Sequence, residues 1–245
     1  MDGNDKELKE MFKISPPYAL KFWNYWHDLF DGDYNSEKCK ESNGGYAITL
    51  STQLQNNLIE TENEQNIFTI WTTNNIQFNP DVIACFKSHA MFNPDKIIYI
   101  LSNTIDIDYF NDHSNIKIIR YDLESLCEKI SVKFKLDYLE KLDKIKTCNF
   151  WYSHETDLLR YLVIYLYGGI YLDSDILLFK NIDYHSLKNT ISYESDKNSS
   201  SQPIASAYFS FEKRHNFMLR CLDRFWRVWN PTIWCCVGPD LINNI

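Results

Sequence analysis

The stretch from His154 to Asp175, which reads HETDLLRYLVIYLYGGIYLDSD, decides the fold of this 245-residue chain. Its first part has apolar residues at the spacing of one helix face. The pair Gly168-Gly169 predicts the end of that helix, because glycine adopts the left-handed conformation that terminates helices. The apolar residues Ile170-Tyr171-Leu172 predict a short buried strand, and Asp173-Ser174-Asp175 follows at its carboxyl end. This order of elements indicates an α/β fold.

The carboxylates of Asp173 and Asp175 are candidates for metal binding. We expect them to share one side of an extended segment, because strand side chains alternate. Two such carboxylates repel unless a cation joins them, and hard oxygen ligands suit Mn²⁺ or Mg²⁺. Asp157 and Arg160 lie one helical turn apart, so both can face the same cleft. Most isolated Asp-x-Asp pairs are solvated turns, but a preceding helix, glycine pair and buried strand favour a functional site.

Further strands and helices alternate before this stretch. Their positions are strands at 67–71, 96–101 and 115–120, and helices at 80–91 and 122–129. Alternation of this kind predicts a mixed, mainly parallel sheet covered by helices. Ligands of such sheets bind at the carboxyl ends of the strands, so we expect the site at that edge.

The composition of the chain divides it into two parts. Residues 1–63 are expected to form an N-terminal appendage, with a ring-rich amphipathic helix at 19–30 and a polar loop at 31–45. Residues 64–245 are expected to form one α/β domain. The lysine-rich stretch 129–146 is interleaved with acidic residues, and we interpret it as solvated helix faces.

Composition and charge exclude several classes of protein. Hydrophobic residues make up 44% of the chain and its net charge is −8, which describes a globular protein without the basic face of a nucleic-acid binder. The polar start predicts no signal peptide, and the longest apolar run, 161–172, is shorter than the ~20 residues of a membrane span. The seven cysteines lack zinc-ligand spacing and are interpreted as small buried hydrophobic residues. A glycosylation sequon at Asn198 has meaning only in a lumenal protein.

Three blocks of sequence resemble one family of enzymes. They are Asp157-x-x-Arg160 with residues 167–175 (YGGIYLDSD), residues 207–218 (AYFSFEKRHNFM), and Ile233-Trp234 with residues 238–241 (GPDL). In this order they are similar to the glycosyltransferases with a DXD sugar-binding region. The group they most resemble is the α-1,4-galactosyl- and α-1,4-N-acetylglucosaminyltransferases of the globotriaosylceramide-synthase type. The resemblance extends from about Asn66 to the last residue.

The resemblance implies a GT-A fold, a UDP-sugar donor and a divalent metal, Mn²⁺ or Mg²⁺. It implies transfer of a hexose or N-acetylhexosamine, with retention of configuration, to a glycan or glycolipid hydroxyl. By the same resemblance, Asp175 binds the metal, while Asp173 binds the metal and the nucleotide ribose. Asp157 and Arg160 contact the donor sugar and diphosphate, so Asp157, Arg160 and Asp173 are the candidate catalytic residues. Tyr171 is implied near the nucleotide, and a role as a core ring is nearly as well supported.

The expected place for uracil and ribose is Trp71-Thr72, because the first strand opens on the same sheet edge. Two departures from the family pattern are Ala205-Ser206, where the family commonly has asparagine, and Cys235-Cys236-Val237, where it tends to have polar residues. The alternative function is therefore a catalytically inactive or fragmentary UDP-sugar-binding paralogue. A haloacid-dehalogenase-like phosphatase also has Asp-x-Asp after an apolar strand, but that strand is the first of its fold.

Family resemblance implies the Golgi lumen, and the absence of an anchor in the chain leaves the cytoplasm as the alternative. We expect His154 to be solvent-exposed or to cap its helix, and His215 to serve the start of the next helix. Trp226, Trp229 and Trp234 are candidates to stack on an acceptor sugar, with core packing at least as well supported for each.

Overall fold

The computed structural model describes residues 65–73, 80–130, 141–194 and 203–245. The expected appendage at 1–63, with its helix, and the sequon at Asn198 lie outside the described residues, so these interpretations stay predictions.

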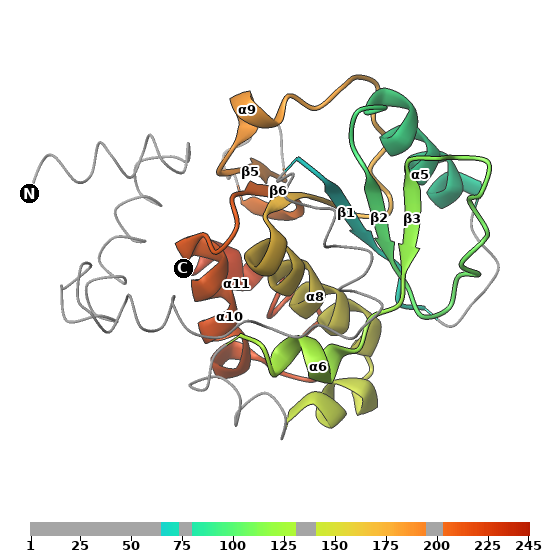
Figure 1. Ribbon diagram of the computed structural model, residues 1–245. Helices are drawn as coiled ribbons and strands as arrows, with labels where there is room; N and C mark the ends of the chain where they lie inside the picture. Colours follow the sequence, from blue (N-terminus) through green and yellow to red (C-terminus); the bar gives the residue numbers. More distant parts are fainter. Residues whose placement is uncertain (1–64, 74–79, 131–140, 195–202) are drawn as a thin grey trace, which may run out of the picture.

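The centre of the protein is a six-stranded sheet with the order β3-β2-β1-β4-β6-β5 (Figure 1). Its strands are β1 (Ile67–Ile70), β2 (Ile98–Leu101), β3 (Ile116–Ile119), β4 (Gly169–Leu172), β5 (Thr190–Tyr193) and β6 (Ile204–Phe211). The pairs among β3, β2, β1 and β4 are parallel, whereas β6 pairs antiparallel with β4 and β5. The expected mixed, mainly parallel sheet is confirmed.

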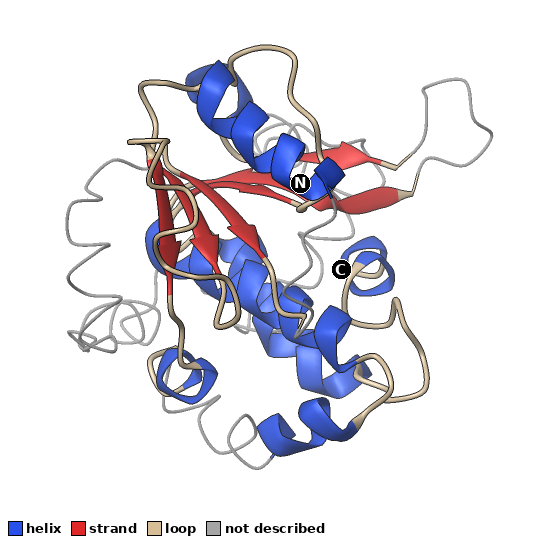
Figure 2. Cartoon of the chain, turned by 90° about the vertical axis from the view of Figure 1, so that its right-hand side faces the viewer, coloured by secondary structure: helices blue, strands red, loops and turns tan. Residues whose placement is uncertain are grey.

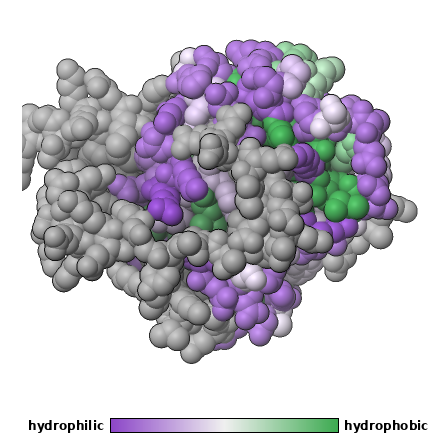
Figure 3. Space-filling model, in the orientation of Figure 1, coloured by the Kyte–Doolittle hydropathy of each residue, from purple (hydrophilic) through white to green (hydrophobic). Residues whose placement is uncertain are grey.

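Helices cover both faces of this sheet, as Figure 2 shows. They are α5 (Pro80–Phe92), α6 (Leu123–Cys127), α8 (Trp151–Tyr167), α9 (Tyr184–Leu187), α10 (Asn216–Val228) and α11 (Pro239–Asn243). The larger core joins one face of the sheet to α6, α8, α10 and α11, and the smaller core joins the other face to α5. All residues of β1, β2 and β4 are buried, as expected of strands covered on both sides. On the face drawn in Figure 3, the described surface is mostly hydrophilic with small apolar patches.

Gly168 connects the long helix α8 to strand β4. Its φ of 67° lies in the left-handed region, and a Cβ atom there would lie 2.6 Å from the backbone nitrogen of Lys213. Both observations require glycine, which confirms the predicted helix stop. The sharp change of direction sends β4 back into the sheet beside β1, so that Asp173 emerges at the carboxyl edge of the parallel strands.

The cysteines fit their interpretation as apolar residues. All six described cysteines have free thiols, and four of them, Cys85, Cys127, Cys221 and Cys236, are buried. Cys39 lies outside the described residues. These buried cysteines therefore stabilise the fold by packing, since a buried thiol behaves as a small hydrophobic group.

Candidate active site

Helix α8 presents Asp157 and Arg160 on neighbouring turns, as their spacing predicted. An amino group of Arg160 lies 3.1 Å from Oδ1 of Asp157, and both side chains are almost fully buried. The Nε of Arg160 also donates to the carbonyl of Thr156 at 3.4 Å. These contacts hold the guanidinium group in one orientation on the helix.

Arg160 joins α8 to the end of β4 and to β6. Its Nη1 lies 3.1 Å from Oδ1 of Asp173 and donates to the carbonyl of Ser206 at 2.7 Å. The guanidinium carbon lies 4.8 Å from the centre of the Tyr171 ring, and the hydroxyl of Tyr171 donates to Oδ1 of Asp173 at 2.5 Å. Four of the predicted site residues, Asp157, Arg160, Tyr171 and Asp173, thus form one connected group. Tyr171 is fully buried, and its hydroxyl contacts one carboxylate oxygen of Asp173.

Charge in this group is unbalanced. Burial raises the pKa of Asp157 to about 7, with Arg160 opposing the shift and Asp173 adding to it. For Arg160, burial disfavours the charged form, but the carboxylates of Asp173 and Asp157 raise its pKa above its ordinary value. Where Asp157 is ionised, above a pH of about 7, the guanidinium lies between two carboxylates and the group has a net negative charge, which attracts cations.

The Asp173-Ser174-Asp175 segment forms a turn, so the expected extended geometry is wrong. The carbonyl of Asp173 accepts from the backbone nitrogen of Ile176 at 3.2 Å, which closes the turn. The side chain of Asp173 is 27% exposed, and Asp175 lies on the surface. Strand alternation therefore ends at Leu172 and no longer sets the directions of the two carboxylates.

The two carboxylates fit a divalent cation of the hard type. The contacts of Asp173 with Tyr171 and Arg160 both use Oδ1. A cation at this carboxylate would therefore bind to Oδ2. Among the described residues, no group of three or more His, Cys, Asp or Glu side chains is placed to hold a metal ion. Mg²⁺ and similar ions are commonly held by one or two carboxylates, with phosphate and water oxygens as the other ligands. Asp173 and Asp175 supply two carboxylates, the type of ligand that such sites use.

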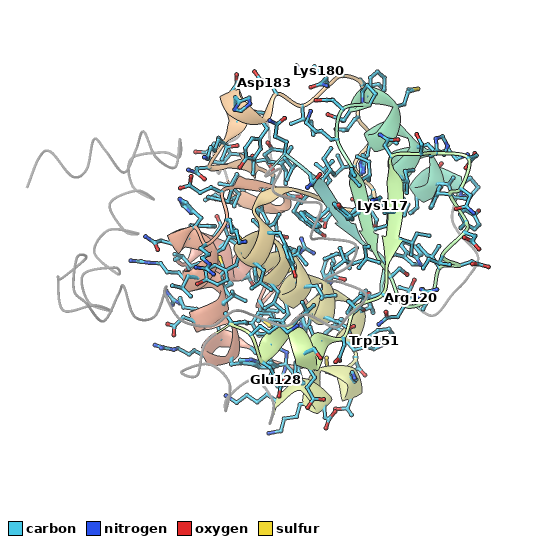
Figure 4. The ribbon with its side chains drawn as sticks, in the orientation of Figure 1. Lys117, Arg120, Glu128, Trp151, Lys180 and Asp183 are labelled. Carbon is cyan, nitrogen blue, oxygen red and sulfur yellow. The ribbon has the colours of Figure 1, made fainter. Side chains whose placement is uncertain are left out.

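Helix α5 anchors the loop that follows this turn, a relationship that we did not predict. Two buried side chains of α5, and that of Asn93 directly after the helix, bind backbone groups of the loop. The contacts are His89 Nε2 to the carbonyl of Ile176 (2.7 Å), the nitrogen of Leu178 to Oγ of Ser88 (3.0 Å), and the nitrogen of Ile182 to Oδ1 of Asn93 (2.9 Å). Burial lowers the pKa of His89 to about 4, so it remains a neutral donor. In Figure 4, Lys180 and Asp183 of this loop point outward at the top of the molecule.

The end of β1 approaches the start of α8. The buried hydroxyl of Thr72 donates to the carbonyl of Tyr152 at 3.2 Å and lies 3.3 Å from the hydroxyl of Thr156. Since the carbonyl of Thr156 also accepts from Arg160, Thr72 is linked to Arg160 through one residue. Trp71 is half-buried at the strand end.

The segment before α11 packs along one face of α8. The Nε2–H of His154 donates to the carbonyl of Ile233 at 3.0 Å, and the hydroxyl of Tyr161 donates to that of Val237 at 2.8 Å. Between these anchors, Gly238 lies against Asp157, where a Cβ atom would stand 2.8 Å from both carboxylate oxygens. The third block of family resemblance, which includes Gly238, thus contacts the first block, which includes Asp157.

The expectation that His154 is exposed or caps its helix is wrong, because its ring is fully buried. The indole nitrogen of Trp229 donates to Nδ1 of His154 at 3.0 Å, so the proton lies on Nε2. Burial lowers its pKa, which keeps the ring neutral. The expectation for His215 is confirmed, since its side chain accepts from the nitrogen of Phe217 and caps α10.

The two segments that depart from the family pattern lie close to the group formed by Asp157, Arg160, Tyr171 and Asp173. Ala205 and Ser206 are buried on β6, where the Ser206 carbonyl binds Arg160. The Cys236 thiol donates to the carbonyl of Asn230 at 3.4 Å and lies 3.8 Å from Nε2 of His154. The Cys235 side chain is half-buried. Polar side chains are thus replaced by backbone and thiol contacts at these positions.

Comparisons with known proteins show that the chain is similar to glycosyltransferases. Residues 79–197 match the sequence model of a family described as "Glycosyltransferase sugar-binding region containing DXD motif". The chain is 26% identical over 192 residues to lactosylceramide 4-alpha-galactosyltransferase of Mus musculus, covering 74% of this chain and 50% of that protein. It is 28% identical over 95 residues to alpha-1,4-N-acetylglucosaminyltransferase of Homo sapiens, covering 39% and 26%. These matches confirm the resemblance, and the chain spans half or less of the length of both relatives.

The solved structure of PaToxG glycosyltransferase is similar to this fold, with a TM-score of 0.52 and 19% identity over 73% of this chain and 67% of that one. The likeness concerns the fold, and it confirms the α/β GT-A architecture. None of the described helices combines the length and the apolar character that a membrane crossing requires.

Proposed function

Residues 79–197 belong to the family of glycosyltransferase sugar-binding regions with a DXD motif, and on this premise we propose that the protein is a hexosyltransferase. It transfers a hexose or N-acetylhexosamine from a UDP-sugar to a hydroxyl of a glycan or glycolipid. The relatives named above act on galactose and N-acetylglucosamine groups, which supports these sugars as donors. The observation that carries the proposal is the group of Asp157, Arg160 and Asp173 beside the exposed Asp175.

Asp173 and Asp175 are the residues that would hold a divalent cation, Mn²⁺ or Mg²⁺. Bound there, the cation would offset the charge of the departing diphosphate. Arg160 fixes Asp173 through a contact of 3.1 Å, and the Tyr171 hydroxyl fixes the same oxygen. The carboxylate of Asp173 is therefore already ordered before the donor binds, so less conformational entropy is lost on binding.

Asp157 and Arg160 are proposed to contact the donor sugar and diphosphate. Arg160 supplies a fixed positive charge next to Asp173, in a site largely withdrawn from water, where electrostatic interactions are strong. Asp157 contacts the other amino group of that guanidinium. Thr72 and Trp71, at the end of β1, are proposed to receive the ribose and uracil, because β1 and β4 open at the same edge.

We propose that transfer retains the anomeric configuration and that the protein acts in the Golgi lumen, both on the strength of the family resemblance. Retention is tested by the anomeric proton coupling of the product in an NMR spectrum taken early in the reaction. The cytoplasm remains the alternative location.

A second candidate function is that of an inactive UDP-sugar-binding protein. It is favoured by Ala205 on β6, because a methyl group cannot hydrogen-bond a donor sugar beside the carbonyl that binds Arg160. Such a protein would bind UDP with the same residues but would neither hydrolyse nor transfer the sugar.

The proposed activity is tested by UDP release from UDP-galactose, UDP-N-acetylglucosamine and UDP-glucose with Mn²⁺, with and without a soluble lactoside as acceptor. We expect release from one of these donors and its loss in Asp175→Ala. Binding of UDP with no release in any reaction would favour the inactive paralogue. Release that persists unchanged in Asp175→Ala would refute the role of Asp175.

A further inference from the structure

Residues 233–237 form a short segment that helix α8 holds at both ends. His154 binds the Ile233 carbonyl at 3.0 Å, and Tyr161 binds the Val237 carbonyl at 2.8 Å. Both of these α8 residues are fully buried, so the anchors are shielded from water. Seven residues of helix separate them, a rise of roughly 10 Å, so the segment runs along α8 past Asp157.

Trp234 lies within this anchored segment, but its side chain is outside the core. It is 57% exposed and follows Ile233, which is 46% exposed. The two other candidate tryptophans differ, since Trp226 is 8% exposed and Trp229 donates to His154. An exposed indole ring on a backbone anchored at both ends offers a flat apolar surface to which a ligand can bind.

The segment that carries Trp234 leads directly to a residue of the proposed donor site. Four residues further along the chain, Gly238 touches the carboxylate of Asp157. Asp157 binds Arg160, which in turn binds Asp173 of the DXD turn. The segment that carries Trp234 is thus connected by direct contacts to the group that is proposed to hold the donor.

We propose that the exposed indole of Trp234 is the platform on which the acceptor sugar ring stacks. This inference rests on the proposed function and adds an acceptor subsite to it. A pyranose ring presents C–H groups on one face and hydroxyl groups at its edge. The C–H face packs on the aromatic ring while the hydroxyl groups stay hydrated or face the donor. Because the backbone of the platform is fixed at both ends, little conformational entropy is lost on binding.

The test measures sugar binding separately from chemistry. The wild-type chain, Trp234→Ala and Trp234→Phe are applied, with UDP and Mn²⁺, to an array of glycans that end in galactose, glucose or N-acetylglucosamine. The matched control is Tyr109→Ala, since Tyr109 is an aromatic residue that is 47% exposed on the loop between β2 and β3. UDP release from the donor is measured on the same four proteins.

We expect binding of some of these glycans to weaken about tenfold in Trp234→Ala. Trp234→Phe keeps most of the binding because it retains a ring, and Tyr109→Ala binds as the wild type does. UDP release without acceptor is unchanged in all variants, since the donor site is intact. Equal binding by wild type and Trp234→Ala, or no binding by the wild type, would overturn the inference. A wild-type protein that releases no UDP would instead refute the proposed function, while the array still decides the role of Trp234.

Discussion

Gly238 lies directly against the carboxylate of Asp157. A Cβ atom at Gly238 would stand 2.8 Å from both carboxylate oxygens, closer than Cβ atoms approach other atoms in proteins. The contact joins the segment before α11 to the middle of α8, far apart in the sequence. It accounts for the glycine at this position, because a larger side chain would meet the carboxylate.

Gly238→Ala is expected to displace Asp157 and with it Arg160. Because small displacements in a catalytic group are costly, UDP release should fall by roughly tenfold or more, with some loss of stability. The measurement is the initial rate of UDP release together with the melting temperature. Pro239→Ala is the control, because its neighbouring position keeps the contact between Gly238 and Asp157. Full activity of Gly238→Ala would show that the carboxylate position is not critical.

Asp157→Asn is expected to raise stability while it lowers activity. The native pKa of Asp157, about 7, lies above its ordinary value of 3.8, chiefly because of burial. The native state therefore favours the protonated form, and the stability of the wild type declines as pH rises from about 4 to 7. An asparagine avoids this penalty and keeps the shape of the side chain. At pH 8 its melting temperature should exceed that of the wild type by ~2–4 °C.

The gain in Asp157→Asn should shrink as the pH is lowered toward 4, where the wild-type carboxyl is protonated in the native state as well. Thermal unfolding at several pH values measures it. A constant difference at all pH values would contradict the assignment of the effect to this ionisation.

His215→Asn is expected to protect the protein from acid. Burial lowers the native pKa of His215 to about 4, below its ordinary value of 6.5. As pH falls from 6.5 toward 4, the unfolded chain binds a proton that the native state resists, so stability is lost by up to ~1.4 kcal/mol per pH unit. Asparagine also caps helices, which preserves the start of α10. Denaturant midpoints at pH 7 and pH 4.5 should therefore differ less in the variant than in the wild type.

His89→Ala is expected to weaken metal use through the loop after the DXD turn. Loss of the hydrogen bond to the Ile176 carbonyl leaves the turn less ordered. The Mn²⁺ concentration for half-maximal UDP binding should rise by roughly tenfold, within the range observed for outer-shell positions. His89→Gln keeps a donor and should restore part of the affinity. Equal Mn²⁺ dependence in wild type and His89→Ala would show that His89 does not influence metal binding.

The fold and the central pair of residues were predictable from local patterns. Helix spacing gave α8, and its regular turns placed Asp157 next to Arg160. The Gly168 stop and the apolar run that follows it gave β4 and the edge of the sheet at which Asp173 lies. These features depend on neighbours within a few residues, which the sequence displays directly.

The remaining parts of the site depend on contacts between distant residues. His154 is paired with Ile233 and Trp229, so its burial could not be inferred from its own polar surroundings in the sequence. The His89 contact with Ile176 joins residues 87 positions apart. The turn at Asp173 was missed because the backbone pairing that closes it overrides strand alternation. The sequence offered one signal for these contacts, namely a polar residue such as His89 among the apolar residues of a predicted helix.

The central claim is that Asp173 and Asp175 bind a nucleotide diphosphate through a divalent cation. It is tested most directly by calorimetric titration of UDP into the wild-type chain, Asp175→Asn and Asp183→Asn, each with Mn²⁺ and with EDTA. Asp183 is a matched control, because it is an exposed carboxylate on the same loop and asparagine preserves its capping of α9. We predict that wild type and Asp183→Asn bind UDP only with Mn²⁺, and that Asp175→Asn binds at least ~10-fold more weakly. Equal UDP binding in Mn²⁺ and EDTA, or by Asp175→Asn and wild type, would contradict the claim.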